Sequence, residues 1–301
     1  MKRIAGFMAA LVLAGCMAVP CRGAELPLTS HAALLMEKTT GQILYAQNEH
    51  DALPPASVTK IMTVLLTMEA IDSGRIALDD VVTVSAYAAG MGGSQVFLAE
   101  GEQITVDELL KAVCVSSGND AAVALAEHVA GVTELFVEQM NNRARELGMK
   151  DTHFANCTGL TAENHVTSAY DIALMSRELL LHHPQIRSYT TIWMDTLRDG
   201  TFGLSNTNKL IRFYDGATGL KTGFTQEAGY CISATAERDG MELIAVIMKG
   251  ATSDSRNTDA KTLLNYGFST YTLLTVQPKE PLPDLPVTLG SADTVAAVLP
   301  E

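Results

Sequence analysis

Residues 218–248 read TGLKTGFTQEAGYCISATAERDGMELIAVIM, and this stretch decides the fold. Two β-rich runs, Gly229–Ala236 and Glu242–Met248, are separated by Arg238-Asp239-Gly240, a strong signal for a hairpin turn. Thr218–Thr225 has the composition of a third strand beside them. These residues predict an antiparallel sheet in the last third of the chain.

A second β-hairpin is predicted near the start of the chain. Two short apolar segments, Ala32–Met36 and Gln42–Ala46, are split by Thr39-Thr40-Gly41. After the last strand, a helix is expected from about Ser255 to Tyr266, closed by Gly267. Because strands lie at both ends and helical patterns lie between them, we expect an α+β fold. One antiparallel sheet is built from both chain ends, and a helical block packs on it.

Start and stop signals define the helices of that block. Pro54 and Pro55 precede an apolar stripe at helical spacing that ends at Gly74, so a helix is expected to open near Ser57. Thr105 and Glu108 form a capping box ahead of another helix. Further helices are expected from about Asp120 to Gly131, from Thr133 to Gly148, and from a cap at Ser168 and Asp171 to just before Pro184.

Composition excludes several classes of protein. The chain has 301 residues, 47% of them hydrophobic, and its 21 basic and 34 acidic side chains give a net charge of −13 and a pI near 4.9. Nucleic acid is not an expected partner, since a nucleic-acid binder needs a basic face. The apolar content excludes a disordered chain, and no long apolar run beyond the N-terminal region indicates a multispanning membrane protein. A globular enzyme is the expected class.

The N-terminus has the pattern of an export signal. Lys2 and Arg3 precede a short apolar stretch from Ile4 to Leu13, and we assign residues 1–24 to a signal peptide. Leu13-Ala14-Gly15-Cys16 resembles a lipobox, in which Cys16 would be acylated, whereas a cut near Gly23 or Ala24 would release a soluble protein. Either route predicts an extracytoplasmic protein of the cell envelope. With the lipid, the protein would be anchored at the outer face of the cytoplasmic membrane.

The remaining cysteines do not form a metal-binding pattern. The five cysteines lack paired C-x-x-C spacing, and Cys114 and Cys231 lie among apolar residues as small buried hydrophobes would. Cys157 lies near His153, which leaves a metal site or a Cys/His pair as an alternative, but two candidates on one loop do not make a ligand set. We therefore expect neither a metal nor a cofactor.

Ser57-Val58-Thr59-Lys60 is the first of three short motifs with chemical meaning. Residues three apart at a helix start share a face, so the Lys60 amine can lie beside the Ser57 hydroxyl. Serine needs an adjacent base to act as a nucleophile, and lysine is a base only when burial or a neighbouring positive charge lowers its pKa. By itself, the pattern is also that of a capping serine with a solvated lysine.

The other two motifs are Ser117-Gly118-Asn119, at a predicted break between helices, and Lys221-Thr222-Gly223, in a predicted strand. Each has an ordinary structural explanation, a turn with an N-cap in the first case and an edge-strand lysine in the second. The glycine of the third motif removes a side chain where another group can approach closely. All three motifs together, in this order, favour a shared catalytic site over three coincidences.

The three motifs resemble the S-x-x-K, S-D-N and K-T-G signature of the penicillin-recognising serine enzymes. Over residues 26–275 the chain is similar to the low-molecular-mass D-alanyl-D-alanine carboxypeptidases, the penicillin-binding proteins of serine peptidase family S11. The segments that carry the similarity are Pro54–Thr63, Gly92-Gly93-Ser94, Ser117–Ala121, Leu147–Phe154 and Gly219–Gly223. The resemblance implies a β-lactamase/transpeptidase-like fold, with residues 25–275 as the catalytic domain.

The resemblance also implies a role for each matching residue. Ser57 would attack the carbonyl of the penultimate D-alanine of a peptidoglycan stem peptide, Lys60 would act as the general base, and Ser117 would relay a proton. The substrate would be held by Asn119, Lys221, Thr222, Gly223, Phe224 and Arg256, where Phe224 contributes an oxyanion-hole N–H together with that of Ser57. β-Lactam antibiotics would acylate Ser57 and act as covalent inhibitors.

Some features of the sequence depart from the family pattern. Phe224 stands where some relatives have a polar residue. Larger members continue into a C-terminal β-domain and a membrane-anchoring helix, whereas residues 276–301 are proline-rich and are interpreted as a tail or the remnant of such a domain. Membrane contact is therefore expected only through a lipid on Cys16.

The sequence also bears on three functions other than that of a carboxypeptidase. A class A-like β-lactamase needs a deacylating glutamate, but Glu163 is followed by Asn164 and His165 rather than by the E-x-x-L-N pattern. A non-catalytic sensor of β-lactams or muropeptides stays open, because sequence does not measure turnover. A Ser-His-Asp hydrolase is disfavoured, since there is no G-x-S-x-G elbow and the seven histidines look like surface or structural residues.

Overall fold

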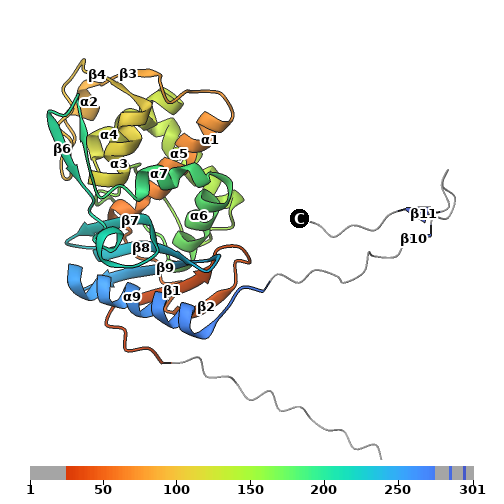
Figure 1. Ribbon diagram of the computed structural model, residues 1–301. Coiled ribbons are helices and arrows are strands. Elements are labelled where there is room, and N and C mark those ends of the chain that lie inside the picture. Colours follow the sequence, from red (N-terminus) through yellow and green to blue (C-terminus); the bar gives the residue numbers. More distant parts are fainter. Residues whose placement is uncertain (1–24, 275–284, 287–293, 296–301) are drawn as a thin grey trace, which may run out of the picture.

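A five-stranded antiparallel sheet, in the order β2-β1-β9-β8-β7, forms the base of the molecule (Figure 1). The computed structural model describes residues 25–274, 285–286 and 294–295. The strands are β1 (Ala32–Glu37), β2 (Ile43–Gln47), β7 (Ala217–Thr225), β8 (Gly229–Arg238) and β9 (Met241–Gly250). The sheet joins the two ends of the region 25–274, because β1 pairs with β9. This confirms the α+β architecture expected from the sequence.

The β8–β9 hairpin turns at the predicted site. Arg238 pairs with Met241, so Asp239 and Gly240 are the two turn residues, and their φ angles are +50° and +78°. Positive φ at both central residues is the requirement of a type I′ turn, which asparagine, aspartate and glycine meet with the least strain.

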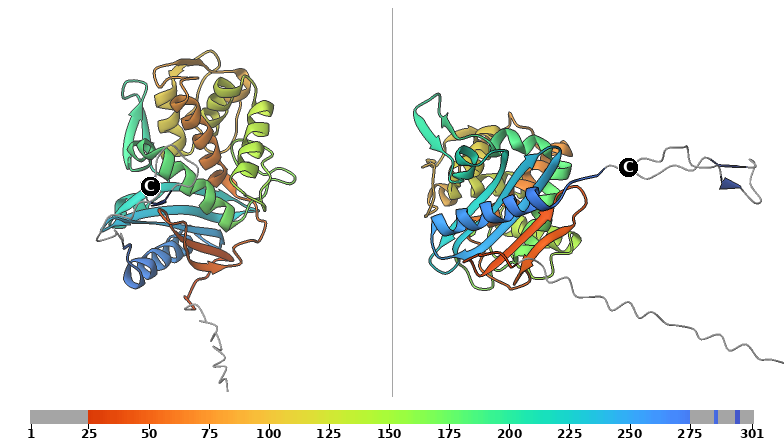
Figure 2. Two further views of the ribbon diagram at one scale, coloured as in Figure 1. Left: turned by 90° about the vertical axis from the view of Figure 1, so that its right-hand side faces the viewer. Right: turned by 60° about the horizontal axis from the view of Figure 1, so that its bottom comes forward.

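The central strands are buried on both faces. In β1 and β9 alternate residues belong to two separate apolar clusters, with Leu34 and Val246 in one and Leu35 and Ala245 in the other. Helix α9 (Ser253–Thr270) covers one face, and α6 (Ala169–His182) with the rest of the helical block covers the other (Figures 1 and 2).

The predicted end of α9 is wrong. The helix runs to Thr270, and Gly267 lies inside it rather than beyond it. A Cβ at Gly267 would lie 2.4 Å from Leu243 Cδ1 and 2.9 Å from Leu35 Cδ2. This glycine therefore allows the helix to pack closely on the sheet, and it does not terminate the helix.

The helical block contains α1 (Lys60–Asp72), α3 (Val106–Ser116), α4 (Asn119–Ala130), α5 (Thr133–Glu146) and α6. Their bounds match the expected helices to within a few residues. Two predicted caps are present: Thr105 and Glu108 make both bonds of a capping box, and the Ser168 side chain accepts the backbone N–H of Asp171. The break between α3 and α4 falls at Ser117 and Gly118, as the second motif indicated.

Several short elements were not predicted. They are β3 (Val81–Thr83), α2 (Ala86–Ala89), β4 (Gln103–Thr105), the 3-10 turn η2 (Pro184–Ile186), α7 (Arg187–Thr190), β5 (Met194–Leu197), β6 (Phe202–Ser205), α8 (Leu210–Phe213), β10 (Leu285–Pro286) and β11 (Thr294–Val295). The β5–β6 hairpin had a usable signal, since Arg198-Asp199-Gly200 repeats the triplet at the β8–β9 turn.

Some expectations concern the ends of the chain. The signal peptide, the lipobox at Cys16 and the cut near Gly23 lie outside the described residues, as does most of the 276–301 tail. Over the part that is described, no helix is long and apolar enough to cross a bilayer. Cys114, Cys157 and Cys231 are buried and free, which confirms the interpretation of Cys114 and Cys231 as small core residues.

Candidate active site

The serine and the lysine of the first motif lie side by side. Ser57 is part of the 3-10 turn η1 (Ala56–Thr59), and α1 begins at Lys60, so the expected helix opens with one tight turn. Lys60 Nζ lies 2.9 Å from Ser57 Oγ. Ala56, directly before the serine, has a φ of +49°, a conformation that a residue with a Cβ rarely adopts.

Lys60 is completely buried, with 0% of its surface exposed. Besides Ser57 Oγ, its Nζ lies 2.6 Å from Asn119 Oδ1 and 2.6 Å from the carbonyl oxygen of Thr158. Both of these oxygens can only accept hydrogen bonds. A neutral amine has two N–H donors and one lone pair, so it satisfies both acceptors and keeps the lone pair for the serine hydroxyl.

Burial and a neighbouring cation both act on the charge of Lys60. Burial lowers the pKa of Lys60 well below its ordinary value, and the positive charge of Lys221 lowers it further. Lys221 is itself buried, and its pKa falls to about 7, chiefly through desolvation and then through the charge of Arg256. Either burial or a neighbouring positive charge was expected to lower the pKa of a lysine base, and Lys60 has both.

The second motif places a hydroxyl and an amide at the junction of α3 and α4. Ser117 adopts a left-handed conformation (φ +62°, ψ +29°), and its buried Oγ is without a hydrogen-bond partner among the described residues. Asn119 begins α4; its Oδ1 accepts from Lys60 and its Nδ2 donates to the carbonyl of Gly92 at 2.7 Å. Asn119 therefore connects the lysine to the segment after α2.

The third motif lies in β7, an edge strand of the sheet, where it passes the Ala56–Thr59 turn that carries the predicted nucleophile Ser57, referred to below as the nucleophile turn. A Cβ at Gly223 would lie 2.8 Å from Ser57 N and 3.0 Å from Pro55 O. The absence of a side chain is therefore what allows the strand to approach Ser57, as the sequence indicated. The Thr222 hydroxyl donates to Thr207 Oγ1 at 2.7 Å, and Lys221 Nζ donates to the Thr222 carbonyl at 2.8 Å.

Phe224 lies exposed on β7, directly after the third motif, whereas Arg256 is buried one strand away from it. Phe224 is 51% exposed and packs against the ring of Tyr230, with centroids 4.3 Å apart. The Arg256 guanidinium is buried and donates to Asn257, Ser253 and, at 3.5 Å, the carbonyl of Cys231. Cys231 is the cross-strand partner of Gly223, so Arg256 is one strand behind the motif and acts on it through its charge.

Sequence reasoning missed two groups in this cluster. The Thr158 carbonyl bonds Lys60, but a backbone carbonyl leaves no signal in the sequence because every residue has one. Thr207 bonds Thr222, and the only local signal is that Asn206 and Asn208 flank it. Asn208 Nδ2 donates to the Gly219 carbonyl at 2.8 Å, which fixes the Thr207 segment against β7.

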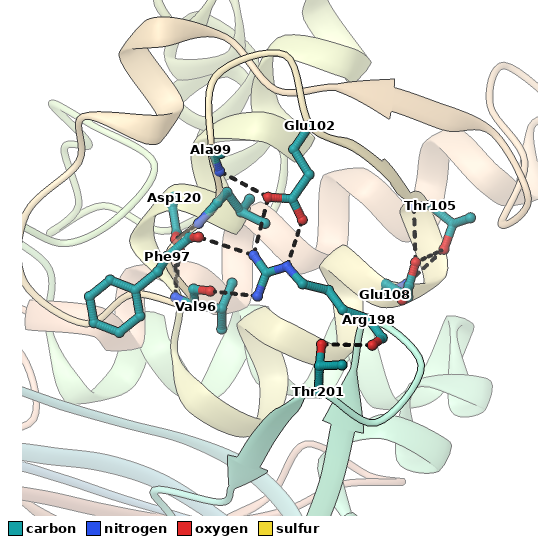
Figure 3. Close-up of polar contacts among 10 residues, drawn as sticks. Val96, Phe97, Ala99, Glu102, Thr105, Glu108, Asp120, Arg198 and Thr201 are labelled. Atoms are coloured by element: carbon teal, nitrogen blue, oxygen red, sulfur yellow. Dashed lines mark hydrogen bonds and ion pairs between the residues drawn. The ribbon is translucent and has the colours of Figure 1, made fainter.

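A group of charged contacts, which we call the strap, lies beside the second motif (Figure 3). In it, Arg198, Glu102 and Asp120 surround the backbone of Val96 and Phe97. From the β5–β6 turn, Arg198 donates to both carboxylate oxygens of Glu102, at 2.7 and 3.2 Å, and to the carbonyls of Val96 and Phe97, at 3.0 and 3.1 Å. The Asp120 carboxylate, next to Asn119, accepts the Val96 N–H at 3.0 Å. The segment around Val96 is therefore held from α4 on one side and from the hairpin on the other.

Among the described residues, neither His153 nor Cys157 belongs to a group that could hold a metal ion. His153 Nδ1 lies 2.9 Å from the Asn164 carbonyl, and the buried Cys157 Sγ makes a long contact of 4.0 Å with the Ala122 carbonyl. Within residues 25–274 and the two short described segments that follow, no group of three or more His, Cys, Asp or Glu side chains could hold a metal ion.

Comparison with known proteins gives consistent results. A family model for D-alanyl-D-alanine carboxypeptidases matches residues 21–252. The chain is 49% identical over 253 residues to the D-alanyl-D-alanine carboxypeptidase DacF of Bacillus subtilis (strain 168), which covers 83% of this chain. The same alignment covers 65% of DacF, so the chain spans slightly less than two thirds of that relative's length.

Solved structures match the fold closely. Penicillin-binding protein 5 from Haemophilus influenzae superposes with a TM-score of 0.84 at 33% identity, covering 91% of this chain and 80% of that chain. Penicillin-binding protein D2 from Listeria monocytogenes, in an ampicillin-bound form, gives a TM-score of 0.75 at 32% identity, covering 81% and 100%. The fold expected from the resemblance is confirmed.

Proposed function

Because the chain belongs to the D-alanyl-D-alanine carboxypeptidase family, we propose that it is a serine carboxypeptidase. It removes the terminal D-alanine from peptidoglycan stem peptides through an acyl-enzyme on Ser57. The observation that carries this proposal is the environment of Lys60: a fully buried amine whose Nζ lies 2.9 Å from a serine hydroxyl and is also bonded to two acceptor-only oxygens.

In the acylation step, Ser57 Oγ attacks the carbonyl carbon of the penultimate D-alanine. The hydroxyl proton passes to the lone pair of Lys60 as the new C–O bond forms. The oxygen of the tetrahedral intermediate takes up negative charge, which the N–H groups of Ser57 and Phe224 stabilise. The approach of Gly223 to Ser57 N supports this assignment, because it brings β7 against the nucleophile turn.

The C–N bond then breaks, and the leaving amine takes the proton back from Lys60 through the Ser117 hydroxyl. Ser117 suits this role because its buried Oγ has no partner among the described residues, so it is free to bond a substrate. The products of this step are free D-alanine and an ester between the peptide and Ser57. Water, deprotonated by the same base, hydrolyses the ester and restores the serine.

Lys221 and Thr222 hold the terminal carboxylate of the substrate in this proposal. A carboxylate beside Lys221 favours its protonated form, which raises its pKa from about 7 and fixes the charge needed for binding. Asn119 orients Lys60 and the substrate amide. Arg256 adds positive potential from behind β8, and Phe224 lies exposed next to the oxyanion site.

β-Lactams present the same reactive carbonyl and carboxylate, and we propose that they acylate Ser57. The relative from Listeria monocytogenes was solved with ampicillin bound. The substrate, peptidoglycan, lies outside the cytoplasm, so we also propose that residues 1–24 carry an export signal. It is cut either at Cys16, whose lipid then attaches the protein to the membrane, or near Gly23 or Ala24, which releases a soluble protein. Residues 25–275 then form the catalytic domain, followed by the 276–301 tail.

The first experiment compares Ser57→Ala with Ser188→Ala, a substitution of an exposed serine on α7. We expect Ser57→Ala to abolish both D-alanine release from a pentapeptide and covalent labelling by a fluorescent penicillin, while Ser188→Ala retains both. Removing the nucleophile of such a unit lowers turnover by about 10³-fold or more.

Each other pattern points to a different function. Labelling of the natural protein without D-alanine release would identify a sensor. Repeated hydrolysis of a β-lactam at turnover rates would identify a β-lactamase. Labelling that persists in Ser57→Ala would show that the nucleophile is another residue.

A further inference from the structure

The loop formed by residues 155–165 lies against the nucleophile turn, and none of the three motifs accounts for it. The loop is closed at its base by a β-bridge between His153 and Val166. Its carbonyl groups accept hydrogen bonds from Lys60 Nζ and from Thr63 Oγ1, each at 2.6 Å. These contacts join one loop to successive turns of the segment that carries the nucleophile.

Gly159 of this loop packs on the peptide bond between Ala56 and Ser57. A Cβ at Gly159 would lie 1.8 Å from Ala56 O and 2.8 Å from Ser57 N, far inside any allowed contact with a backbone. Ala56 has a left-handed conformation, with a φ of +49°. Such a conformation persists in a non-glycine residue only when its surroundings hold it there. Gly159 and, from β7, Gly223 are the surroundings in direct contact with this peptide.

His165 makes the second contact, to Thr59. It is 4% exposed, and its Nδ1 accepts the backbone N–H of Ala155 at 2.9 Å. Because that amide can only donate, the proton of the neutral ring is on Nε2, which donates to Thr59 Oγ1 at 2.8 Å. Burial, followed by the electrostatic effects of His153 and Lys60, lowers the pKa of His165 to about 4, so the ring is neutral at pH 7.

We propose that Gly159 and His165 are positioning residues for acylation. Together they hold the Ala56–Thr59 turn in the conformation that places Ser57 Oγ 2.9 Å from Lys60 Nζ. The inference rests on the proposed function, since it assigns Ser57 and Lys60 as the reacting pair. Its physical basis is that a displacement of about 1 Å in a reacting group can cost about 100-fold in rate.

The loop lies next to a cavity, so a substitution at position 159 can displace the loop without unfolding the protein. Asn156, Cys157 and Thr158 also line a cavity of about 430 Å³. Main chain displaced by a new side chain at position 159 can shift into that space. The expected consequence of a substitution is therefore a folded protein with a misplaced nucleophile.

The test compares Gly159→Ala with Gly148→Ala. Gly148 has a φ of +74°, close to the +85° of Gly159, and a Cβ at position 148 would meet nothing within 4 Å. The two substitutions therefore share the backbone penalty of a left-handed residue, and only the first pushes on the nucleophile turn. Acylation by a fluorescent penicillin gives two readouts: the final labelled fraction counts competent molecules, and the rate constant reports the geometry of the site.

We expect the acylation rate constant of Gly159→Ala to fall by about 30- to 100-fold, and that of Gly148→Ala to stay within about twofold of the natural protein. Equal rate constants for the two variants would overturn the role of Gly159. A loss confined to the labelled fraction, with an unchanged rate constant, would also overturn it, because that is the result of a merely structural role.

His165 provides the second set of variants if Gly159→Ala does not fold. Glutamine can accept from the Ala155 amide and donate to Thr59, whereas leucine can do neither. We expect His165→Leu to lower the acylation rate constant about tenfold or more and His165→Gln to recover most of it. His183→Leu is the control, since His183 is also buried but bonds Asp72, at the far end of α1.

If His165→Leu and His183→Leu acylate at the same rate, or if glutamine gives no rescue, the role of His165 is refuted. D-alanine release by the natural protein is measured in parallel. Its absence, with penicillin acylation intact, would refute the carboxypeptidase function while the rate ratios among variants still decide the positioning roles.

Discussion

At the scale of single residues, two buried lysines determine the chemistry. Lys60 and Lys221 are separated by 160 positions in sequence, yet the charge of one lowers the pKa of the other. In the proposed mechanism the two lysines act in different protonation states: Lys60 is a neutral base, and Lys221 is a cation that binds a carboxylate. Lys221 has a pKa of about 7, so the binding of a carboxylate beside it and its protonation are coupled in the proposed mechanism.

The lowered pKa of Lys221 predicts how stability depends on pH. Its ordinary pKa is 10.5 and its folded value is about 7. Between these values the unfolded chain binds more protons at this lysine than the folded chain, so the free energy of unfolding rises with pH across that window. Below pH 7 Lys221 is protonated in the folded protein, and the burial of its charge lowers the free energy of unfolding by its full amount.

We therefore expect the free energy of unfolding, measured in urea, to rise between pH 7 and pH 9 by about 2 kcal/mol more in the natural protein than in Lys221→Met. Lys221→Met also removes a charge that lowers the pKa of Lys60, and this coupling changes the difference between the two proteins in the same direction. At pH 7, Lys221→Met should be the more stable protein and should no longer release D-alanine. Parallel pH curves for the two proteins would contradict this account.

At the scale of elements, the α3–α4 junction and the β5–β6 hairpin depend on each other. The Asp120 carboxylate of α4 accepts the Val96 N–H, and Arg198 of the β5–β6 turn donates to the Val96 carbonyl (Figure 3). The Asn119 N–H also donates to the Ser94 carbonyl, at 2.7 Å. Because Asn119 bonds Lys60, this strap supports one wall of the site.

Arg198→Ala is expected to loosen both parts of the strap. The guanidinium is 27% exposed and makes a two-point ion pair with Glu102, so its loss should lower the free energy of unfolding by about 1–3 kcal/mol. Hydrogen exchange should accelerate in residues 94–99 and 194–205 and stay unchanged in α9. The control is Arg212→Ala, at an exposed arginine of α8; a similar response to both substitutions would argue against a specific strap.

At the scale of the whole molecule, Glu242 of β9 joins the sheet to the helical block. It is 1% exposed and pairs with Lys38 at 2.8 Å and with Arg187 of α7, and it also accepts from the Thr218 hydroxyl at 2.8 Å. A single carboxylate therefore links three parts of the fold: the residue that follows β1 (Lys38), strand β7 (Thr218) and helix α7 of the helical block (Arg187). Removing its charge leaves two cations without their main partner.

We expect Glu242→Gln to lower the free energy of unfolding by about 3 kcal/mol, because it removes the buried counter-charge of Lys38 and Arg187, whose side chains are only 18% and 31% exposed. Glu237→Gln is a close comparison: its carboxylate pairs with the same Arg187 at 2.8 Å but is 38% exposed. Water compensates that loss, so the expected cost is below about 1 kcal/mol. Chemical denaturation of both variants gives the test, and equal costs would mean that Glu242 does not connect the layers.

Local sequence determined the features whose causes are local. The Asp239-Gly240 turn, the capping box of Thr105 and Glu108, and the proximity of Ser57 to Lys60 each depend on residues within three or four positions of one another. Where the cause was not local, local signals misled: Gly267 looked like a helix end, but its neighbours Leu243 and Leu35 come from the sheet. The short strands β3 and β4 have three residues each, too few for an alternation pattern to be visible.

The sequence by itself determined which groups are available: three motifs in order, on a chain whose two ends supply one sheet. Only the tertiary structure decided what those groups can do. The burial of Lys60, the charge of Lys221 beside it, and the contacts of Gly159 and His165 with the nucleophile turn all depend on segments distant in sequence. The physical reason is that a pKa depends on the solvent and charge surrounding an atom, and these exist only after the sheet and the helical block have packed together.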